Sequence, residues 1–195
     1  MRSSRTERKT QETAVSAGLE LDGTGDFETD TGVPFFDHML SQFAKQGLFD
    51  LKLKAKGDLK VDAHHTVEDV GIVLGEAFRQ ALGDKLGVER YGFSNCPMDE
   101  SLASVTVDIS GRSCCVFSAS FARQEIGGMP TENVRDFFEA FTRSCPCAVN
   151  IQIICGENDH HKIEAVFKAF GRAMRDACAI NPRVEGKIQS TKGIL

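Results

Sequence analysis

Apolar positions recur along the chain with two different spacings. Apolar positions three or four residues apart predict helices over residues 34–47, 64–82, 134–145 and 160–178. Alternation of apolar and polar positions predicts strands over residues 49–55, 103–111, 114–122 and 149–154, and a further strand pair around residues 21–26. The order helix, strand, helix therefore occurs twice, and a turn that contains glycine precedes the second helix each time.

This repetition predicts an internally duplicated α+β fold. Each half is expected to form a two-layer α/β sandwich, the first over about residues 1–90 and the second over about residues 91–195. No linker or low-complexity segment separates the halves. We therefore expect a single domain, residues 1–195, in which the two pseudo-symmetric halves pack together.

Composition and charge exclude several classes of protein. A chain of 195 residues with 41% hydrophobic residues can bury a sizeable core, and a net charge of −5 argues against a general nucleic-acid binder. The apolar runs are too short to span a bilayer, and the first twelve residues lack the apolar segment of a secretory signal. We therefore expect a cytoplasmic protein, or one of the plastid stroma whose transit peptide has been removed. The seven cysteines lack framework spacing and are expected to be free thiols.

The histidines are concentrated in two matching motifs. Four of the five stand in the pairs His64, His65 and His160, His161, and each pair is followed by a glutamate, Glu68 or Glu164. On a helix, the first histidine and the glutamate lie on one face, because they are four residues apart, while the second histidine points about a quarter-turn away. Imidazole with carboxylate is a typical ligand set for Mn, Fe or Zn. The alternative is that these are polar helix-start residues satisfied by caps and solvent, but two matching copies favour metal.

The fifth histidine, His38, lies on the helix that precedes the first motif. Its counterpart in the second half falls at Asp136, which is 24 residues before His160. A carboxylate also binds hard divalent ions, although an acidic residue near a helix start is favourable without any metal. We expect two pseudo-symmetric sites, formed by the following groups: His38, His64, Glu68 and one of the second pair; and Asp136, His160, Glu164 and one of the first pair.

A second set of residues is basic or hydroxylic. Its members are Arg90, Arg112, Lys168, Ser190 and Lys192. Each one alone is more often a solvated surface group. Together they could hold a phosphate through charge-assisted hydrogen bonds.

Longer strings of the sequence resemble the imidazoleglycerol-phosphate dehydratase family of histidine biosynthesis. The strings are RKTQET, FFDHML, GDLKVDAHHTVEDVGIVLG, RYG, PMDESL, VDISGR, GENDHHKIEAVFKAF and STKGIL, and they are spread along nearly the whole length of the chain in the family's order. The resemblance implies a fold related to the second domain of ribosomal protein S5, and subunits that associate into trimers and a 24-subunit shell. It also implies a Mn-dependent hydro-lyase with two Mn²⁺ ions per active site. The substrate would be a small phosphorylated imidazole compound, with no nucleic acid and no membrane as partner.

The resemblance also implies roles for individual residues. Family metal ligands match His38, His64, His65, Glu68, His160, His161 and Glu164. Phosphate contacts match Arg90, Arg112, Lys168, Ser190 and Lys192, and Gln42 and Asp99 match positions near the substrate. Glu12 matches a catalytic acid/base, and whether it acts alone or with Glu164 or a metal-bound water stays open.

The implied reaction explains the need for metal. Imidazole glycerol phosphate loses water to give imidazole acetol phosphate, and the hydrogen to be removed sits on a carbon with no adjacent carbonyl group. The imidazole ring must then accept the electrons. If two metals hold its nitrogens, the ring can exist as a metal-bound imidazolate and expel the neighbouring hydroxyl through a diazafulvene-like intermediate. Glu12 would move the proton.

Three positions depart from the family pattern. Asp136, Asn150 and Gln46 stand where many members have histidine. We interpret Asn150 and Gln46 as structural changes, whereas Asp136 exchanges a nitrogen ligand for oxygen and bears on metal preference.

Two other functions remain open from the residues. A non-catalytic Mn-binding shell protein would need the metal motifs but not SGR or STKG, so the basic set argues against it. A metal-dependent hydrolase or phosphatase would use the same ions to activate water.

Overall fold

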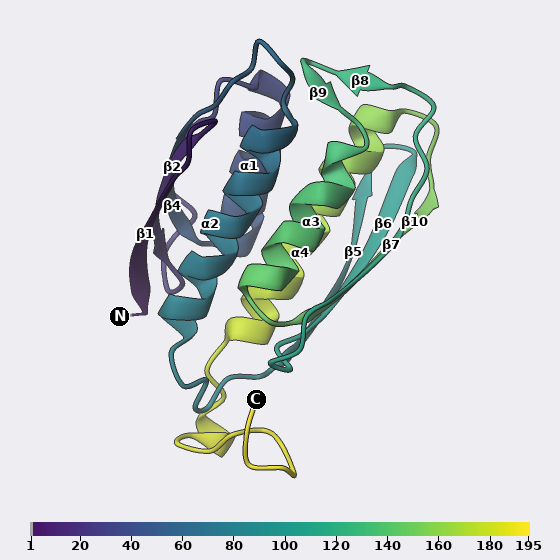
Figure 1. The fold of residues 1–195 in the computed structure, drawn as a ribbon. Coiled ribbons are helices and arrows are strands. Elements are labelled where there is room, and N and C mark those ends of the chain that lie inside the picture. The colour runs from purple at the N-terminus through teal and green to yellow at the C-terminus, as the bar shows by residue number, and fades with distance from the viewer. Residues whose placement is uncertain (1) are drawn as a thin grey trace.

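The computed structural model describes residues 2–195 as four stacked layers, a sheet, two pairs of helices and a second sheet (Figure 1). In the first half these elements are β1 (Ser3–Lys9), β2 (Ala14–Glu20), β3 (Phe27–Asp30), α1 (Pro34–Gly47), β4 (Asp50–Lys56) and α2 (His64–Leu82). In the second half they are β5 (Tyr91–Met98), β6 (Ser101–Asp108), β7 (Cys114–Ser118), α3 (Asn133–Ser144), β10 (Ala148–Cys155) and α4 (Asp159–Cys178). A small hairpin, β8 (Glu125–Ile126) and β9 (Met129–Pro130), precedes α3.

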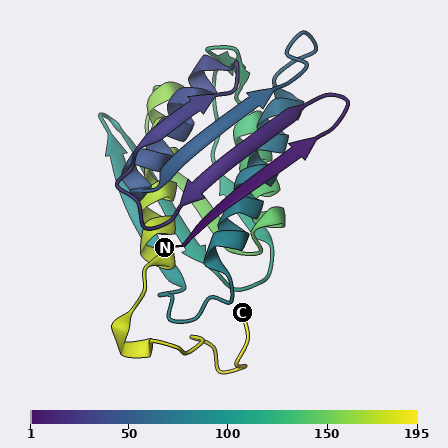
Figure 2. The same ribbon diagram turned by 90° about the vertical axis from the view of Figure 1, so that its left-hand side faces the viewer.

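Both large sheets have the same topology. Their strand orders are β1-β2-β4-β3 and β5-β6-β10-β7, so the last strand of each half inserts between its second and third strands. In each sheet that inserted strand runs parallel to the third strand and antiparallel to the second. Figure 2 shows the outer face of the first sheet with the helices behind it. The internally duplicated α+β class predicted from the sequence is confirmed.

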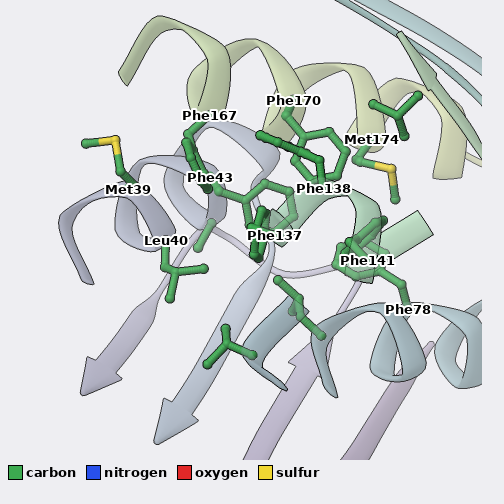
Figure 3. Close-up of a cluster of buried hydrophobic side chains, with 14 of the residues drawn as sticks. Met39, Leu40, Phe43, Phe78, Phe137, Phe138, Phe141, Phe167, Phe170 and Met174 are labelled. Atoms are coloured by element: carbon green, nitrogen blue, oxygen red, sulfur yellow. The ribbon is translucent and has the colours of Figure 1, made fainter. Parts of the chain in front are cut away.

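The helices of the two halves pack against each other through phenylalanine side chains. The ring of Phe170 on α4 lies 5.1 Å from those of Phe43 on α1 and of Phe138 and Phe141 on α3 (Figure 3). All four rings are fully buried. Burial of apolar surface on this scale is the main term that stabilises the folded chain, and here it joins the two halves into one core.

Two glycines set which helices lie side by side. Gly171 on α4 lies against the backbone oxygen of Phe43 on α1, and Gly75 on α2 lies against that of Phe141 on α3. A Cβ at either position would clash with that oxygen, so only glycine allows the helices to come this close. Consequently α1 packs on α4 and α2 packs on α3, each across the boundary between the halves.

All four long helices begin at the end of the molecule that carries the β8–β9 hairpin (Figure 1). The segment after α4, residues 179–195, contains one 3-10 turn, Pro182–Val184, and extends from the opposite end (Figures 1 and 2). The two histidine motifs therefore lie together at one end, and the chain's last residues lie at the other.

The structure adds elements that the hydrophobic pattern did not predict. β5 is one of them, because its buried face consists of Gly92, Ser94 and Cys96, which are small or polar. The region before α1 holds three strands instead of a pair, and β7 ends at Ser118 instead of continuing to residue 122. No helix within residues 2–195 is long and apolar enough to cross a membrane.

Candidate metal centre

Each histidine pair lies at the start of a helix, and a similar side-chain hydrogen bond holds its first histidine. The backbone N–H of His64 donates to Oδ1 of Asp62 at 2.8 Å, and that of His160 donates to Oδ1 of Asn158 at 2.9 Å. A side-chain oxygen two residues upstream satisfies an otherwise unpaired helix-start N–H group in both cases. The predicted equivalence of the two motifs thus extends to the backbone that holds them.

The first group of possible ligands joins α1 to α4. Oε2 of Glu164 lies 3.2 Å from Nε2 of His38 and 3.2 Å from Nε2 of His160. One ligand atom from each of these three residues lies within 4.8 Å of the others, which is a spacing that could hold a metal ion. The group combines two imidazole nitrogens with a carboxylate oxygen, a donor set that suits a divalent transition metal.

Glu164 is buried and is held in its charged form. Lys168, one turn further along α4, places Nζ 2.6 Å from Oε1 of Glu164. Burial alone would raise the pKa of Glu164, but the hydrogen bonds from Lys168 and His38 outweigh it and keep that pKa below its ordinary value. An ionised carboxylate is therefore available as a ligand beside the two histidines.

The second group joins α2 to α3 and is less complete. Nδ1 of His64 lies 3.3 Å from Oδ2 of Asp136. Burial raises the pKa of Asp136, and the nearby His64 acts in the opposite direction. Glu68, the counterpart of Glu164, is turned to Arg143 instead, with 2.7 Å between Oε1 and Nη2.

These groups correct the pairing expected from the sequence. We expected His38 to lie with His64, Glu68 and one of the second pair, and Asp136 to lie with His160, Glu164 and one of the first pair. Within one chain Glu164 lies with His38 and His160, and Asp136 lies with His64, because α1 packs on α4 and α2 on α3 through Gly171 and Gly75. Ligands from both halves thus meet in a single chain, which spacing along the sequence could not indicate.

The second histidine of each pair is bound to a carboxylate through Nδ1. Nδ1 of His65 lies 3.0 Å from Oδ2 of Asp58, and Nδ1 of His161 lies 2.7 Å from Oε2 of Glu100. These hydrogen bonds raise the pKa of both imidazoles, and the bond from His161 is the largest of the causes that hold the pKa of Glu100 far below its ordinary value. Sequence reasoning missed Asp58 and Glu100, since neither stands at helical spacing from its histidine.

Three expected substrate-side residues lie near these histidines. Glu12, in the turn between β1 and β2, places Oε2 3.7 Å from Nδ1 of His65 and forms with it and Asp58 a further cluster that could hold a metal ion. Oδ2 of Asp99 lies 3.7 Å from Nε2 of His161. Gln42 stands one helical turn after His38 on α1 and is half-buried.

The basic residues divide between the two ends of the molecule. Lys168 lies with Glu164, but the backbone N–H of Arg90 donates to Ala177 near the end of α4. Ala177 is about 25 Å along the helix from His160, at 1.5 Å per residue. Arg90 also donates to the backbone oxygen of Gln189 at 2.7 Å, and Gly111, beside Arg112, lies against Leu195.

Arg90, Arg112 and the tail with Ser190 and Lys192 are therefore close to one another and far from the metal motifs of the same chain. Arg90 is further held by Asp108, with 2.7 Å between Nε and Oδ1, and its guanidinium lies 4.6 Å from the ring centre of Tyr91. A phosphate held by these residues could not reach the histidines of its own chain.

The other two departures from the family pattern lie apart from the histidine groups. Gln46 stands in the last turn of α1, where its backbone oxygen accepts a hydrogen bond from Arg175 at 3.4 Å. Asn150 is exposed on β10.

Comparisons with known proteins agree in sequence and in structure. The family model for imidazoleglycerol-phosphate dehydratase (IGPD) matches residues 31–174. The chain is 52% identical over 195 residues to the imidazoleglycerol-phosphate dehydratase of Lactiplantibacillus plantarum, with all of both chains covered, and 53% identical over 188 residues to that of Acetivibrio thermocellus, with 96% of each covered.

Two solved structures are similar as well. The Pyrococcus furiosus IGPD in complex with (S)-C348 superposes with a TM-score of 0.84 at 33% identity, covering 97% of this chain and 99% of that one. The Staphylococcus aureus enzyme gives a TM-score of 0.83 at 37% identity, covering 92% and 99%.

Proposed function

The chain belongs to the imidazoleglycerol-phosphate dehydratase family and is a hydro-lyase of histidine biosynthesis, and from this premise we propose that Mn²⁺ ions held by its two histidine motifs serve the dehydration. The substrate is imidazole glycerol phosphate and the product imidazole acetol phosphate. The observation that carries the metal assignment is the convergence of His38, His160 and Glu164 at the helix starts, with ligand atoms within 4.8 Å of one another.

The donor atoms fit a divalent transition metal better than they fit Mg²⁺ or Ca²⁺. Imidazole nitrogens predominate in the first group, whereas Mg²⁺ and Ca²⁺ favour oxygen ligands. In the second group Asp136 contributes oxygen where His38 contributes nitrogen, so the two sites differ in ligand chemistry. We propose that the remaining predicted ligands, His65, Glu68 and His161, join these two groups when metal is present.

The bound ions would supply positive charge that stabilises electron density on the substrate's imidazole ring. The chain's own residues must hold the substrate and move the proton. Glu12 is suited to the proton transfer because its carboxylate is largely exposed and lies 3.7 Å from Nδ1 of His65. Glu164 is less suited, since both of its oxygens already bind Lys168, His38 and His160, and we assign it as a ligand.

The position of the basic residues supports a site shared between copies of the chain. Arg90, Arg112, Ser190 and Lys192 would hold the phosphate, yet Arg90 lies beside the end of α4 and the tail, opposite the metal groups. Figure 1 shows the segment after α4 at that end of the molecule. A second copy that presents its basic end to this copy's histidines would complete the site. Such a head-to-tail contact closes into a ring when its rotation is a whole fraction of a turn, which is compatible with trimers and a 24-subunit shell of one-domain chains.

The non-catalytic Mn-binding shell protein and the metal-dependent hydrolase lose their support. Relatives that are 52% and 53% identical over essentially the whole chain are dehydratases. The basic residues that a storage protein would not need are also present here.

Incubation of the purified protein with imidazole glycerol phosphate tests both parts of the proposal. After chelation and removal of the chelator, we expect no formation of the ketone product, and we expect MnCl₂ to restore it. Zn²⁺ and Mg²⁺ are added in parallel for comparison with Mn²⁺. Mg²⁺ should restore little product formation because it prefers oxygen ligands. Full turnover by protein shown to be free of metal would refute the metal assignment but not the family.

A further inference from the structure

Two carboxylates outside the expected ligand set hold equivalent histidines in equivalent ways. Both oxygens of Asp58 lie within 3.2 Å of Nδ1 of His65, and Oε2 of Glu100 lies 2.7 Å from Nδ1 of His161. In each case the ring is held by Nδ1, and Nε2 is left free of the carboxylate. In both motifs the second histidine is therefore hydrogen-bonded to a carboxylate through the same ring nitrogen.

The duplication of the fold does not account for this agreement. Asp58 stands seven residues before His65, in the turn between β4 and α2, whereas Glu100 stands 61 residues before His161, in the turn between β5 and β6. In the second half the corresponding turn, residues 156–158, is shorter, and Nδ1 of His161 binds Glu100 instead. The two halves thus obtain the same carboxylate partner from unrelated segments, which indicates a requirement of the site.

We propose that Asp58 and Glu100 are positioning residues that fix the tautomer and the direction of the His65 and His161 rings for metal binding. An ionised carboxylate can only accept a hydrogen bond, so in the neutral ring Nδ1 carries the proton and Nε2 keeps its lone pair. A histidine that binds metal through one nitrogen commonly donates its other N–H to a carboxylate, which makes the ring a stronger ligand. The inference rests on the proposed metal function. It adds that Nε2, and not Nδ1, of His65 and of His161 binds the metal ion.

The two carboxylates differ in what else they hold. Oε1 of Glu100 also accepts from the backbone N–H groups of Glu157 at 3.2 Å and Asn158 at 2.9 Å, so it ties the β5–β6 turn to the start of α4. Within residues 2–195, the Asp58 side chain makes hydrogen bonds with His65 alone. Asp58 therefore tests ring orientation without disturbing a loop.

The experiment titrates MnCl₂ into the full-length apoprotein and measures free Mn²⁺ by electron paramagnetic resonance. For Asp58→Asn we expect the parent's number of ions at saturation, with the dissociation constant of one class of site raised about 10- to 100-fold. Asp58→Ala should weaken binding at least as much, because no acceptor remains. Glu76→Gln is the matched control, since this carboxylate binds Arg79 and Gln80 further along the same helix as His65.

A second measurement separates orientation from general loss of structure. The melting temperature of Asp58→Asn without metal should equal the parent's, while the increase produced by a fixed Mn²⁺ concentration should be smaller. Unchanged Mn²⁺ affinity in Asp58→Asn would overturn this inference and leave the proposed function intact. Loss of an ion even at saturating Mn²⁺ would overturn it too, because Asp58 would then be a ligand itself. A parent protein that binds no Mn²⁺ would overturn both.

Discussion

Nδ1 of His64 lies 3.3 Å from Oδ2 of Asp136, across the contact between α2 and α3. The related contact between α1 and α4 brings His38 beside His160 and Glu164. Asp136 thus occupies in the second half the place that His38 occupies in the first. The two helix pairs carry similar ligand groups near their N-terminal ends, but one group has an oxygen where the other has a nitrogen.

Gly171 is expected to control both stability and the first ligand group. Gly171→Ala would drive a Cβ into the backbone oxygen of Phe43 and push α1 away from α4. We expect the free energy of unfolding to fall by about 1–3 kcal/mol, the usual cost of overpacking, and Mn²⁺ binding to weaken because His38 moves with α1. Urea unfolding and Mn²⁺ titration measure the two effects.

Gly18→Ala is the control for this substitution, because a Cβ at Gly18 meets nothing within 4 Å. It should leave Mn²⁺ affinity unchanged. Equal stability losses in the two variants would contradict the close-packing argument.

Asp159 should make the stability of the apoprotein depend on pH. Its carboxylate is buried, accepts from the backbone N–H groups of Ala122 and Arg123 at 2.8 Å, and binds Lys162 at 2.8 Å. Burial would raise the pKa of Asp159, but the bonds from Lys162 and the backbone outweigh it and lower the pKa. The stabilisation is therefore complete above the unfolded pKa of about 3.9 and is lost as pH falls through the lower, folded pKa.

Asp159→Asn should accordingly lower the free energy of unfolding by about 1.5–3 kcal/mol at pH 7 and by progressively less below about pH 4. Urea unfolding of the metal-free protein across this range measures the difference. Asp26→Asn, an exposed carboxylate with no side-chain hydrogen bond among the described residues, is the control. A difference that stayed constant between pH 7 and pH 3 would contradict the assigned pKa.

The positions of the long helices and the types of metal ligand could be predicted from the sequence, but the grouping of the ligands in space could not. The repeated helical pattern located all four long helices to within a residue, because each buries a continuous apolar stripe. The ligand types were also visible, since HHxxE recurs at helix starts. The pairing of His38 with His160 was not, because it depends on Gly75 and Gly171 and on which helices they allow to touch. Glu100 was invisible for a similar reason, as only the packing of the β5–β6 turn against α4 brings it to His161.

The last residues of the chain are expected to act on substrate and not on metal. Truncation after Gly186 removes Ser190 and Lys192, which lie near Arg90 and far from the histidine groups. Loss of one charge-assisted contact to the phosphate should cost about 1.5–3 kcal/mol, or roughly ten- to a hundredfold in substrate affinity. Steady-state kinetics should show a raised KM, and metal analysis should show an unchanged Mn content.

Point substitutions sharpen the same test. Lys192→Met should reproduce most of the effect, whereas Lys187→Met, a cation in the same segment outside the predicted phosphate set, should not. If KM and kcat were unchanged in the truncated protein, the phosphate role of the tail would be wrong.

Removal of metal should also change the size of the particle. Each chain offers only a few ligands at each group, and a divalent cation of this class takes four to about six. Ligands from neighbouring copies would supply the rest, so metal binding and association are expected to be linked. Size-exclusion chromatography should show a smaller particle in chelator and recovery with Mn²⁺. A large particle that persisted after complete removal of metal would show that other contacts hold the assembly.

The pairing of Asp136 with His64 leads to the most specific expectation about the ions. If Asp136 is a ligand, Asp136→Asn keeps its shape and removes its charge, so one Mn²⁺ site should weaken and the rate should fall strongly, while the site at His38 stays filled. If Asp136 only complements the helix dipole at the start of α3, the substitution should cost no more than about 0.3–1 kcal/mol of stability. Asp136→His supplies the nitrogen that His38 supplies in the other half, and it should restore occupancy and shift preference toward metals that favour imidazole. Metal analysis at limiting Mn²⁺ distinguishes the two roles, because a ligand role requires Asp136→Asn, and not Asp136→His, to lose one ion per chain. Two ions bound to Asp136→Asn as tightly as to the parent would leave the helix dipole as the role of Asp136.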